Sequence, residues 1–157
     1  MKKIISLVLV VALALACLVA CGDAEKDYTL AIGVATSQDG AEVSSTVAAL
    51  VLEDGKIVAC RIDTLVVTAT FTGDVINAGS YPTKAEKGDD YGMLTNSDYF
   101  GSKLAEWYVQ AQAYADTAVG KTASEVASLS TEKIPGSCTM YVGGYKIALE
   151  KAASYVR

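Results

Sequence analysis

Residues 28–71 carry the pattern that most restricts what this chain can fold into. Bulky and small side chains alternate over residues 28–36, which predicts a strand with one bulky and one small face. The Val-, Ser- and Thr-rich residues 43–52 predict a second strand, which runs into Asp54-Gly55, a pair typical of tight hairpin turns. Residues 56–71 predict a long third strand. Consecutive strands joined by short turns indicate an antiparallel sheet.

The third strand is predicted to bury one of its faces. Side chains two residues apart on a strand point the same way, and four apolar residues share one side of this strand. They are Val58, Cys60, Ile62 and Val66. Cys60 is therefore expected to be buried rather than reactive.

A long connection follows the third strand. Residues 73–98 contain Pro82 and several glycines, a composition that favours turns. Loops of this length inside a domain are uncommon and often functional. We interpret Asp89-Asp90 in this loop as solvated charge, with a metal site as the alternative.

An aromatic stripe predicts the first helix. Apolar residues recur at the helical period and would face the sheet. They are Phe100, Leu104, Trp107, Tyr108, Ala111, Tyr114 and Ala115.

The next stretch, Gly120-Lys121-Thr122, is similar to the end of a phosphate-binding loop. That loop needs a glycine where Ala115 stands, so we reject this interpretation. We expect instead that Gly120 ends the first helix. Thr122 and Glu125 then predict a capping box for a short second helix.

The C-terminal part predicts a late strand and a final helix. Residues 138–142 follow Pro135 and read as a short strand. The helix after them has one apolar side, formed by Tyr145, Ala148, Leu149, Ala152 and Val156. The predicted fold class is α+β: a small antiparallel sheet of three N-terminal strands plus one late strand, packed by two to three helices.

The N-terminus has the pattern of an export signal. Lys2 and Lys3 precede residues 4–20, an uncharged apolar run of 17 residues that is short for a membrane span of about 20. Cys21 follows small and branched apolar residues, as in the lipobox of bacterial lipoproteins, and Cys17 fits that motif less well.

These features divide the chain into three parts. We expect a lipoprotein signal peptide over residues 1–20, a lipidated tether over residues 21–27 and one domain over residues 28–157. Acylation of Cys21 would anchor the domain to the cell membrane at its extracytoplasmic face, because two long acyl chains bind a bilayer firmly.

The charge of the mature chain limits its partners. Residues 1–20 hold two of the 13 basic residues and none of the 18 acidic ones, so 11 basic residues remain against 18 acidic and the side chains carry −7. This balance argues against nucleic acid and against anionic lipid headgroups, which both attract basic surfaces. The expected membrane contact is therefore the lipid on Cys21.

Two cysteines, Cys60 and Cys138, remain in the domain. Thiols outside the cytoplasm can pair, and the sequence leaves a disulfide between them open.

Several common chemistries lack their residues here. The chain contains no histidine, so nucleophilic triads built on that base are impossible and the commonest zinc ligand is missing. Two thiols far apart form no CxxC motif, and no dinucleotide-binding glycine fingerprint is present. The remaining options are binding, or redox chemistry that an imported cofactor supplies.

Three stretches together resemble small extracytoplasmic FMN-binding domains. Such domains occur in the sodium-pumping NADH:quinone reductase and in flavin-carrying bacterial lipoproteins. The stretches are residues 54–63, residues 82–93 leading to Glu106-Trp107, and residues 139–148. The resemblance implies an FMN cofactor and a membrane redox protein as partner.

The family attaches FMN to a threonine in a Ser-Gly-Ala-Thr-x-Thr segment before the last helix. Residues 136–141 read Gly-Ser-Cys-Thr-Met-Tyr here, so Thr139 aligns with the first threonine and Tyr141 replaces the usual acceptor. The resemblance therefore implies noncovalent binding, with Ser137, Thr139 and an aromatic residue such as Tyr91 among the contacts.

Gly143-Gly144 at the start of the last helix could hold the phosphate, because free backbone N–H groups there attract anions. The alternative is that both glycines only give the turn its conformational freedom. The aromatic stripe of the first helix is likewise either a core face or a flavin-stacking face. We thus expect a noncovalent flavin module for electron transfer, with a flavin-free binding or assembly lipoprotein as the second hypothesis and no stand-alone catalysis.

Overall fold

The computed structural model describes residues 26–68, 71–72, 75–76, 81–101 and 103–156. A three-stranded antiparallel sheet dominates the domain, in the order β1 (Tyr28–Asp39), β2 (Glu42–Glu53) and β3 (Lys56–Thr68). All three predicted strands are confirmed, with β1 longer than expected. The α+β class is confirmed as well.

The turn between β2 and β3 forms as its sequence predicts. Asp54 has φ 50° and Gly55 has φ 79°, so both central residues are left-handed, as a type I′ hairpin turn requires. The amide of Asp54 also donates to the carbonyl of Asp27 at 3.1 Å, which holds the start of β1 beside this turn.

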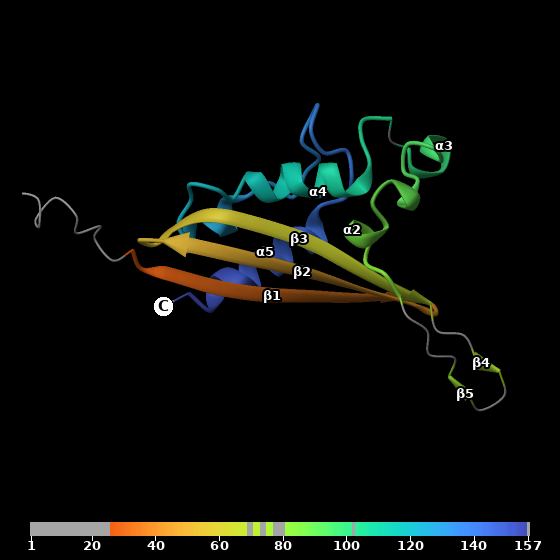
Figure 1. The fold of residues 1–157 in the computed structure, drawn as a ribbon, viewed down its shortest axis with the longest axis horizontal. Helices are drawn as coiled ribbons and strands as arrows, with labels where there is room; N and C mark the ends of the chain where they lie inside the picture. Colours follow the sequence, from red (N-terminus) through yellow and green to blue (C-terminus); the bar gives the residue numbers. More distant parts are fainter. Residues whose placement is uncertain (1–25, 69–70, 73–74, 77–80, 102, 157) are drawn as a thin grey trace, which may run out of the picture.

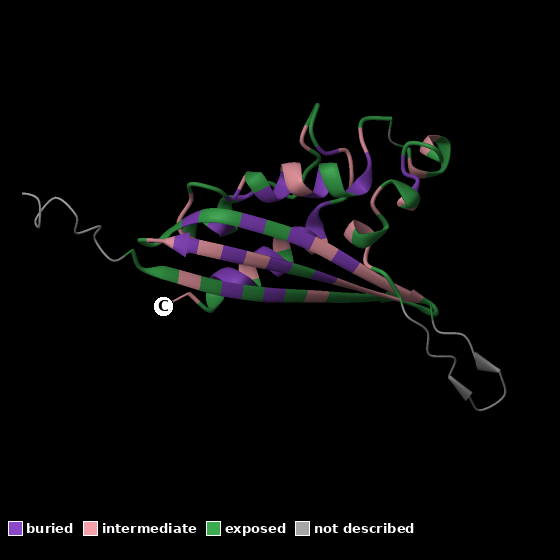
Figure 2. Cartoon of the chain, viewed as in Figure 1, coloured by how far each residue is buried: buried purple, intermediate pink, exposed green. Residues whose placement is uncertain are grey.

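The alternation along β1 reverses the usual relation between size and burial. Its small residues Ala31 and Gly33 are buried, whereas the bulky Leu30 and Ile32 are exposed. Helix α5 (Gly143–Ser154) lies across the small face, and a Cβ on Gly33 would overlap the α5 backbone at Ala148 and Ala152. Figures 1 and 2 show α5 on one side of the strands and exposed residues alternating with buried ones along them.

A β-bulge changes which residues of β3 are buried. Val51 pairs with Ala59 but Leu52 pairs with Ile57, so Val58 is an extra residue on β3. Val58 is exposed and Ile57 is buried instead, which corrects the predicted face. Cys60 and Ile62 are buried as predicted.

The helices are shorter and more numerous than the sequence predicted. Helix α4 (Trp107–Asp116) begins at Trp107 rather than near Phe100, which ends the separate short helix α3 (Ser97–Phe100). The predicted second helix is the 3-10 helix η2 (Ala123–Ser128), where Glu125 accepts from the amide of Thr122 at 2.8 Å.

The predicted loop holds further regular structure. The hairpin β4 (Phe71–Thr72) and β5 (Val75–Ile76), helix α2 (Lys84–Lys87) and the 3-10 helix η1 (Gly88–Tyr91) lie between β3 and α3.

The predicted late strand is wrong. In the described part of the chain, residues 138–142 form no strand; Cys138 makes only an isolated bridge with Ile134 across a turn. The turn contains Pro135, which has no amide hydrogen to contribute to a ladder.

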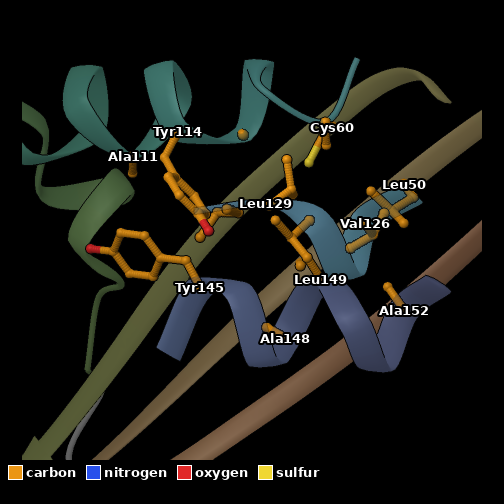
Figure 3. Packing of buried hydrophobic residues seen from close by; sticks show 14 of the residues in the cluster. Leu50, Cys60, Ala111, Tyr114, Val126, Leu129, Tyr145, Ala148, Leu149 and Ala152 are labelled. Atoms are coloured by element: carbon orange, nitrogen blue, oxygen red, sulfur yellow. The ribbon is translucent and has the colours of Figure 1, made fainter. Parts of the chain in front are cut away.

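One core joins the inner face of the sheet to the helices. Figure 3 shows side chains from α4 and α5 meeting those of the strands. The largest fully buried side chains of this core include Trp107, Tyr114, Leu50 and Leu149. No described helix has the length and apolar character that crossing a membrane requires.

Candidate functional site

The start of α5 leaves backbone donors without a partner inside the helix, with Gly143 buried there and Gly144 half-buried. Val142 precedes the helix, and no side chain caps it. The first amide bonded within the helix is that of Lys146, which donates to Val142 at 3.0 Å. The amides before it are the donors that a helix leaves without an internal partner, and they carry the positive end of its dipole.

Gly144 leaves room beside these amides. A Cβ at Gly144 would have the hydroxyl oxygen of Thr46 as its nearest neighbour, at 3.9 Å. Thr46 is buried on the inner face of β2 and shares a 3.0 Å hydrogen bond with the hydroxyl of Thr64 on β3. The start of α5 therefore lies beside the hydroxyl of Thr46, which is itself bonded to Thr64.

Tyr141 lies against the other glycine. Its ring occupies the position that a Cβ on Gly143 would take, although the side chain is 81% exposed. An open cavity of about 530 Å³ borders Tyr141 and is otherwise lined by Thr131, Glu132 and Lys133.

Thr139 is tied to α4. Its amide and its hydroxyl both donate to Oε1 of Gln110, at 2.9 and 3.0 Å. Gln110 is fully buried, and its Nε2 donates to the carbonyl of Ala105 at 2.6 Å. Thr139 thus anchors the segment before α5 to the core, and its hydroxyl has a hydrogen-bond partner within the protein.

The contact of Ser137 lies in the turn after Pro135 and not at the start of α5. Ser137 is exposed there, and its amide donates to the carbonyl of Ile134 at 3.1 Å. The structure gives Ser137 a role in this turn.

Four aromatic rings link the segment after β3 to α5. Tyr91 meets Trp107 with ring centroids 6.4 Å apart, and Trp107 meets Tyr145 edge-on at 6.1 Å. Tyr145 lies in the first turn of α5 and also meets Tyr114 at 5.9 Å. The structure thus connects the predicted residue Tyr91 to the Gly143-Gly144 helix start through Trp107.

Lys84 completes this cluster. Its Nζ lies 5.2 Å from the ring centroid of Tyr91 and 5.6 Å from that of Trp107, within the range of cation–π attraction. Among the described residues, Lys84 forms no ion pair with a carboxylate. Partial burial lowers the pKa of Lys84, and the negative charge of Glu42 opposes that shift.

Hydrogen bonds at both ends fix the segment that carries Lys84 and Tyr91. At its start, Oδ1 of Asp63 accepts from the amide of Ala85 at 3.1 Å and holds α2 against β3. At its end, the carboxylate of Glu106 accepts from the amides of Met93 and Leu94 at 2.8 and 3.0 Å. The cluster therefore rests on a segment bonded to the core on both sides.

Sequence reasoning missed Lys84, Gln110 and Glu106. Thr83-x-x-Glu86 is a capping box, and both of its hydrogen bonds are present: Thr83 Oγ1 accepts from the amide of Glu86 at 3.1 Å and Glu86 from that of Thr83 at 2.7 Å. This motif marks a helix start directly before Lys84 and could have indicated the residue.

The two cysteines stay apart from this chemistry. Cys60 and Cys138 are buried free thiols in the structure, so the disulfide left open by the sequence is absent from it. Burial raises the pKa of Cys60 to about 12 and also raises that of Cys138, which keeps both as thiols at neutral pH.

Two further expectations concern metal and lipid. Within the described residues, no group of three acidic or cysteine side chains could hold a metal ion, and Asp89 instead accepts from the hydroxyl of Tyr108 at 3.1 Å. Cys21, the expected acylation site, lies outside the described residues.

Comparisons with known proteins give no relative. No protein-family model, curated protein or solved structure matches this chain.

Proposed function

We propose that this chain is a lipid-anchored extracytoplasmic domain that binds FMN without a covalent bond, beside Lys84 and the start of α5. A membrane redox protein would exchange electrons with it. The resemblance of the sequence to FMN-binding domains motivates the choice of ligand.

The observation that carries this proposal is the position of Lys84. A partly buried ammonium faces two aromatic rings, and among the described residues no carboxylate pairs with it. A ligand with an anionic group and a flat ring offers both missing contacts, because phosphate pairs with an ammonium and aromatic rings stack. FMN has this composition.

The residues around Lys84 suit such a ligand. The amides of Gly143 and Gly144, at the uncapped start of α5, are donors of the type that binds phosphate, and Gly144 is half-buried beside the hydroxyl of Thr46. Tyr91 offers a half-buried ring. Bound FMN would supply electron transfer, and the protein would hold its phosphate and exclude water from its ring.

The contacts of Thr139 support a noncovalent mode of binding. Its hydroxyl already donates to the fully buried Gln110, and a phosphoester would remove that hydrogen. We therefore assign Thr139 a positioning role for the segment that leads to α5.

The test measures FMN binding by the full-length protein in detergent, through flavin absorbance and fluorescence. Lys84→Met keeps most of the side-chain length but removes the charge, and it should weaken FMN binding about tenfold or more, as expected for a lost charge-assisted hydrogen bond. Lys103→Met, at an exposed lysine, should bind FMN like the wild type.

Riboflavin, which lacks the phosphate, separates the two halves of the site. It should bind more weakly than FMN, and Lys84→Met should change riboflavin affinity little. A protein that stays colourless with FMN and gives no calorimetric heat would overturn the proposal.

The second candidate is a flavin-free binding or assembly lipoprotein. The exposed apolar side chains of β1 favour it, because such surfaces on soluble domains mark interaction sites. It predicts a complex in the membrane that survives Thr139→Val and Gly144→Ala.

A further inference from the structure

An open groove of about 410 Å³ lies between α4 and β3, which pack against each other (Figure 1). One residue of β3 and five residues of α4 line it: Arg61, Tyr108, Val109, Gln112, Ala113 and Asp116. Its volume falls in the range of small-molecule sites. None of these residues belongs to the proposed FMN site, so the groove is a separate feature of the domain.

The groove carries one charge of each sign. Arg61 supplies a guanidinium and Asp116 a carboxylate, and both residues are exposed. Neither of them forms an ion pair with the other or with any further residue in the described part of the chain. The two groups border the same space without neutralising one another, so a ligand between them can pair with each.

Hydrogen bonds hold the walls of the groove in place. Nε2 of Gln112 donates to the carbonyl of Cys60 at 3.1 Å and to Oδ1 of Asp116 at 2.7 Å, which fixes the carboxylate beside β3. The hydroxyl of Tyr108 donates to Oδ1 of Asp89 at 3.1 Å, and this bond orients the tyrosine ring. Groups that are already positioned lose little conformational freedom when a ligand binds, which favours affinity.

The rest of the lining is largely apolar. Val109 and Ala113 contribute aliphatic side chains, and Tyr108 contributes a ring. Apolar walls with a few placed polar groups are typical of sites that bind small molecules. A ligand that matches this groove has an apolar part and one charge of each sign.

We propose that the groove binds a small zwitterion with an apolar side chain, the chemistry of amino acids and short peptides. The guanidinium of Arg61 takes the carboxylate of the ligand, because these two planar groups pair through parallel hydrogen bonds. The carboxylate of Asp116 takes the ammonium, on the oxygen that Gln112 does not occupy. Tyr108, Val109 and Ala113 contact the apolar side chain.

The test measures binding of L-leucine and of L-leucyl-L-leucine to the full-length protein in detergent, by titration calorimetry. At least one of them should bind. Arg61→Gln and Asp116→Asn each remove one charge, and each should weaken this binding about tenfold or more, as expected for a lost charge-assisted hydrogen bond. Lys103→Gln, at an exposed lysine outside the groove, should bind like the wild type.

Blocked forms of the same compound test each charge on the wild-type protein, so this part does not depend on how the variants fold. The N-acetylated form lacks the ammonium and the C-terminal amide lacks the carboxylate, and each should bind about tenfold more weakly than the parent compound. Asp116→Asn should then leave the affinity for the N-acetylated form unchanged, and Arg61→Gln that for the amide.

The result is independent of the FMN site. Lys84→Met should leave binding of the zwitterion unchanged, and Arg61→Gln should leave FMN binding unchanged. The proposal is overturned if neither L-leucine nor L-leucyl-L-leucine binds, if both blocked forms bind as tightly as the parent compound, or if Arg61→Gln and Asp116→Asn bind like the wild type.

Discussion

Gly33 sets the distance between the sheet and α5. A Cβ at this position would overlap the carbonyl of Ala148 and the amide of Ala152, both backbone atoms of the helix. Helix backbone cannot move aside as a side chain can, so the close packing of α5 on β1 depends on this one glycine. The surrounding helix residues Ala148 and Ala152 are themselves small and fully buried.

Gly33→Ala should therefore destabilise the protein by about 3 kcal/mol, the upper part of the range for overpacked cores. Chemical denaturation followed by circular dichroism measures this loss. Ser37→Ala, at an exposed residue of the same strand, should stay within about 0.5 kcal/mol of the wild type. Equal stability of the Gly33→Ala protein would show that the sheet and helix do not approach this closely.

Among the elements, α2 depends on hydrogen bonds at its first residues. It spans only four residues, and a helix of that length has no independent stability. The capping box of Thr83 and Glu86 and the bond from Ala85 to Asp63 hold it in place. These contacts fix the direction in which Lys84 leaves the backbone.

Thr83→Ala should cost about 1 kcal/mol, the usual value for a lost N-cap. The measurement is the midpoint of urea denaturation. If α2 positions Lys84 as we describe, the same variant should also weaken FMN binding in the assay above. Thr95→Ala, an exposed threonine in the following turn, serves as the matched control and should leave both quantities unchanged.

At the scale of the whole molecule, burial of ionisable groups links folding to pH. Burial raises the pKa of Cys60 from 9.0 to about 12 and that of Tyr114 from 10.0 to about 12. Both groups favour the neutral form in the folded state, so their contribution to stability is complete below about pH 9 and is lost as the pH rises toward 12. Lys84 acts in the opposite sense, because its pKa is lowered.

The free energy of unfolding should therefore fall between about pH 8 and about pH 10.5, since the raised groups outnumber the lowered one. Guanidinium denaturation at both pH values measures the change. Cys60→Ala removes the contribution of one thiol, so its stability should fall less over the same interval, whatever its stability at the lower pH. An identical pH dependence in both proteins would contradict the burial of Cys60.

Local patterns of the sequence were sufficient for the three N-terminal strands. The alternation in β1 and the Asp54-Gly55 turn depend on neighbours along the chain, and the structure confirms both. The sequence placed the start of α4 too early, near Phe100 rather than at Trp107. Phe100 and Leu104 fit the helical period, but Gly101, with φ 63°, ends the preceding helix. Periodicity alone does not register such an interruption.

By itself, the sequence determined the α+β class, the three strands, the buried side of α5, the glycines that open α5 and most of the buried side of α4. Leu104 and Tyr108, which the helical period placed on the buried side, are exposed. Only the tertiary structure decided which face of β1 is covered, because the choice depends on how closely a distant helix can approach Gly33. The same holds for the cluster of Lys84, Tyr91 and Trp107 and for the bond between Thr139 and Gln110. These contacts join residues far apart in the chain, and no local propensity encodes the distance between them.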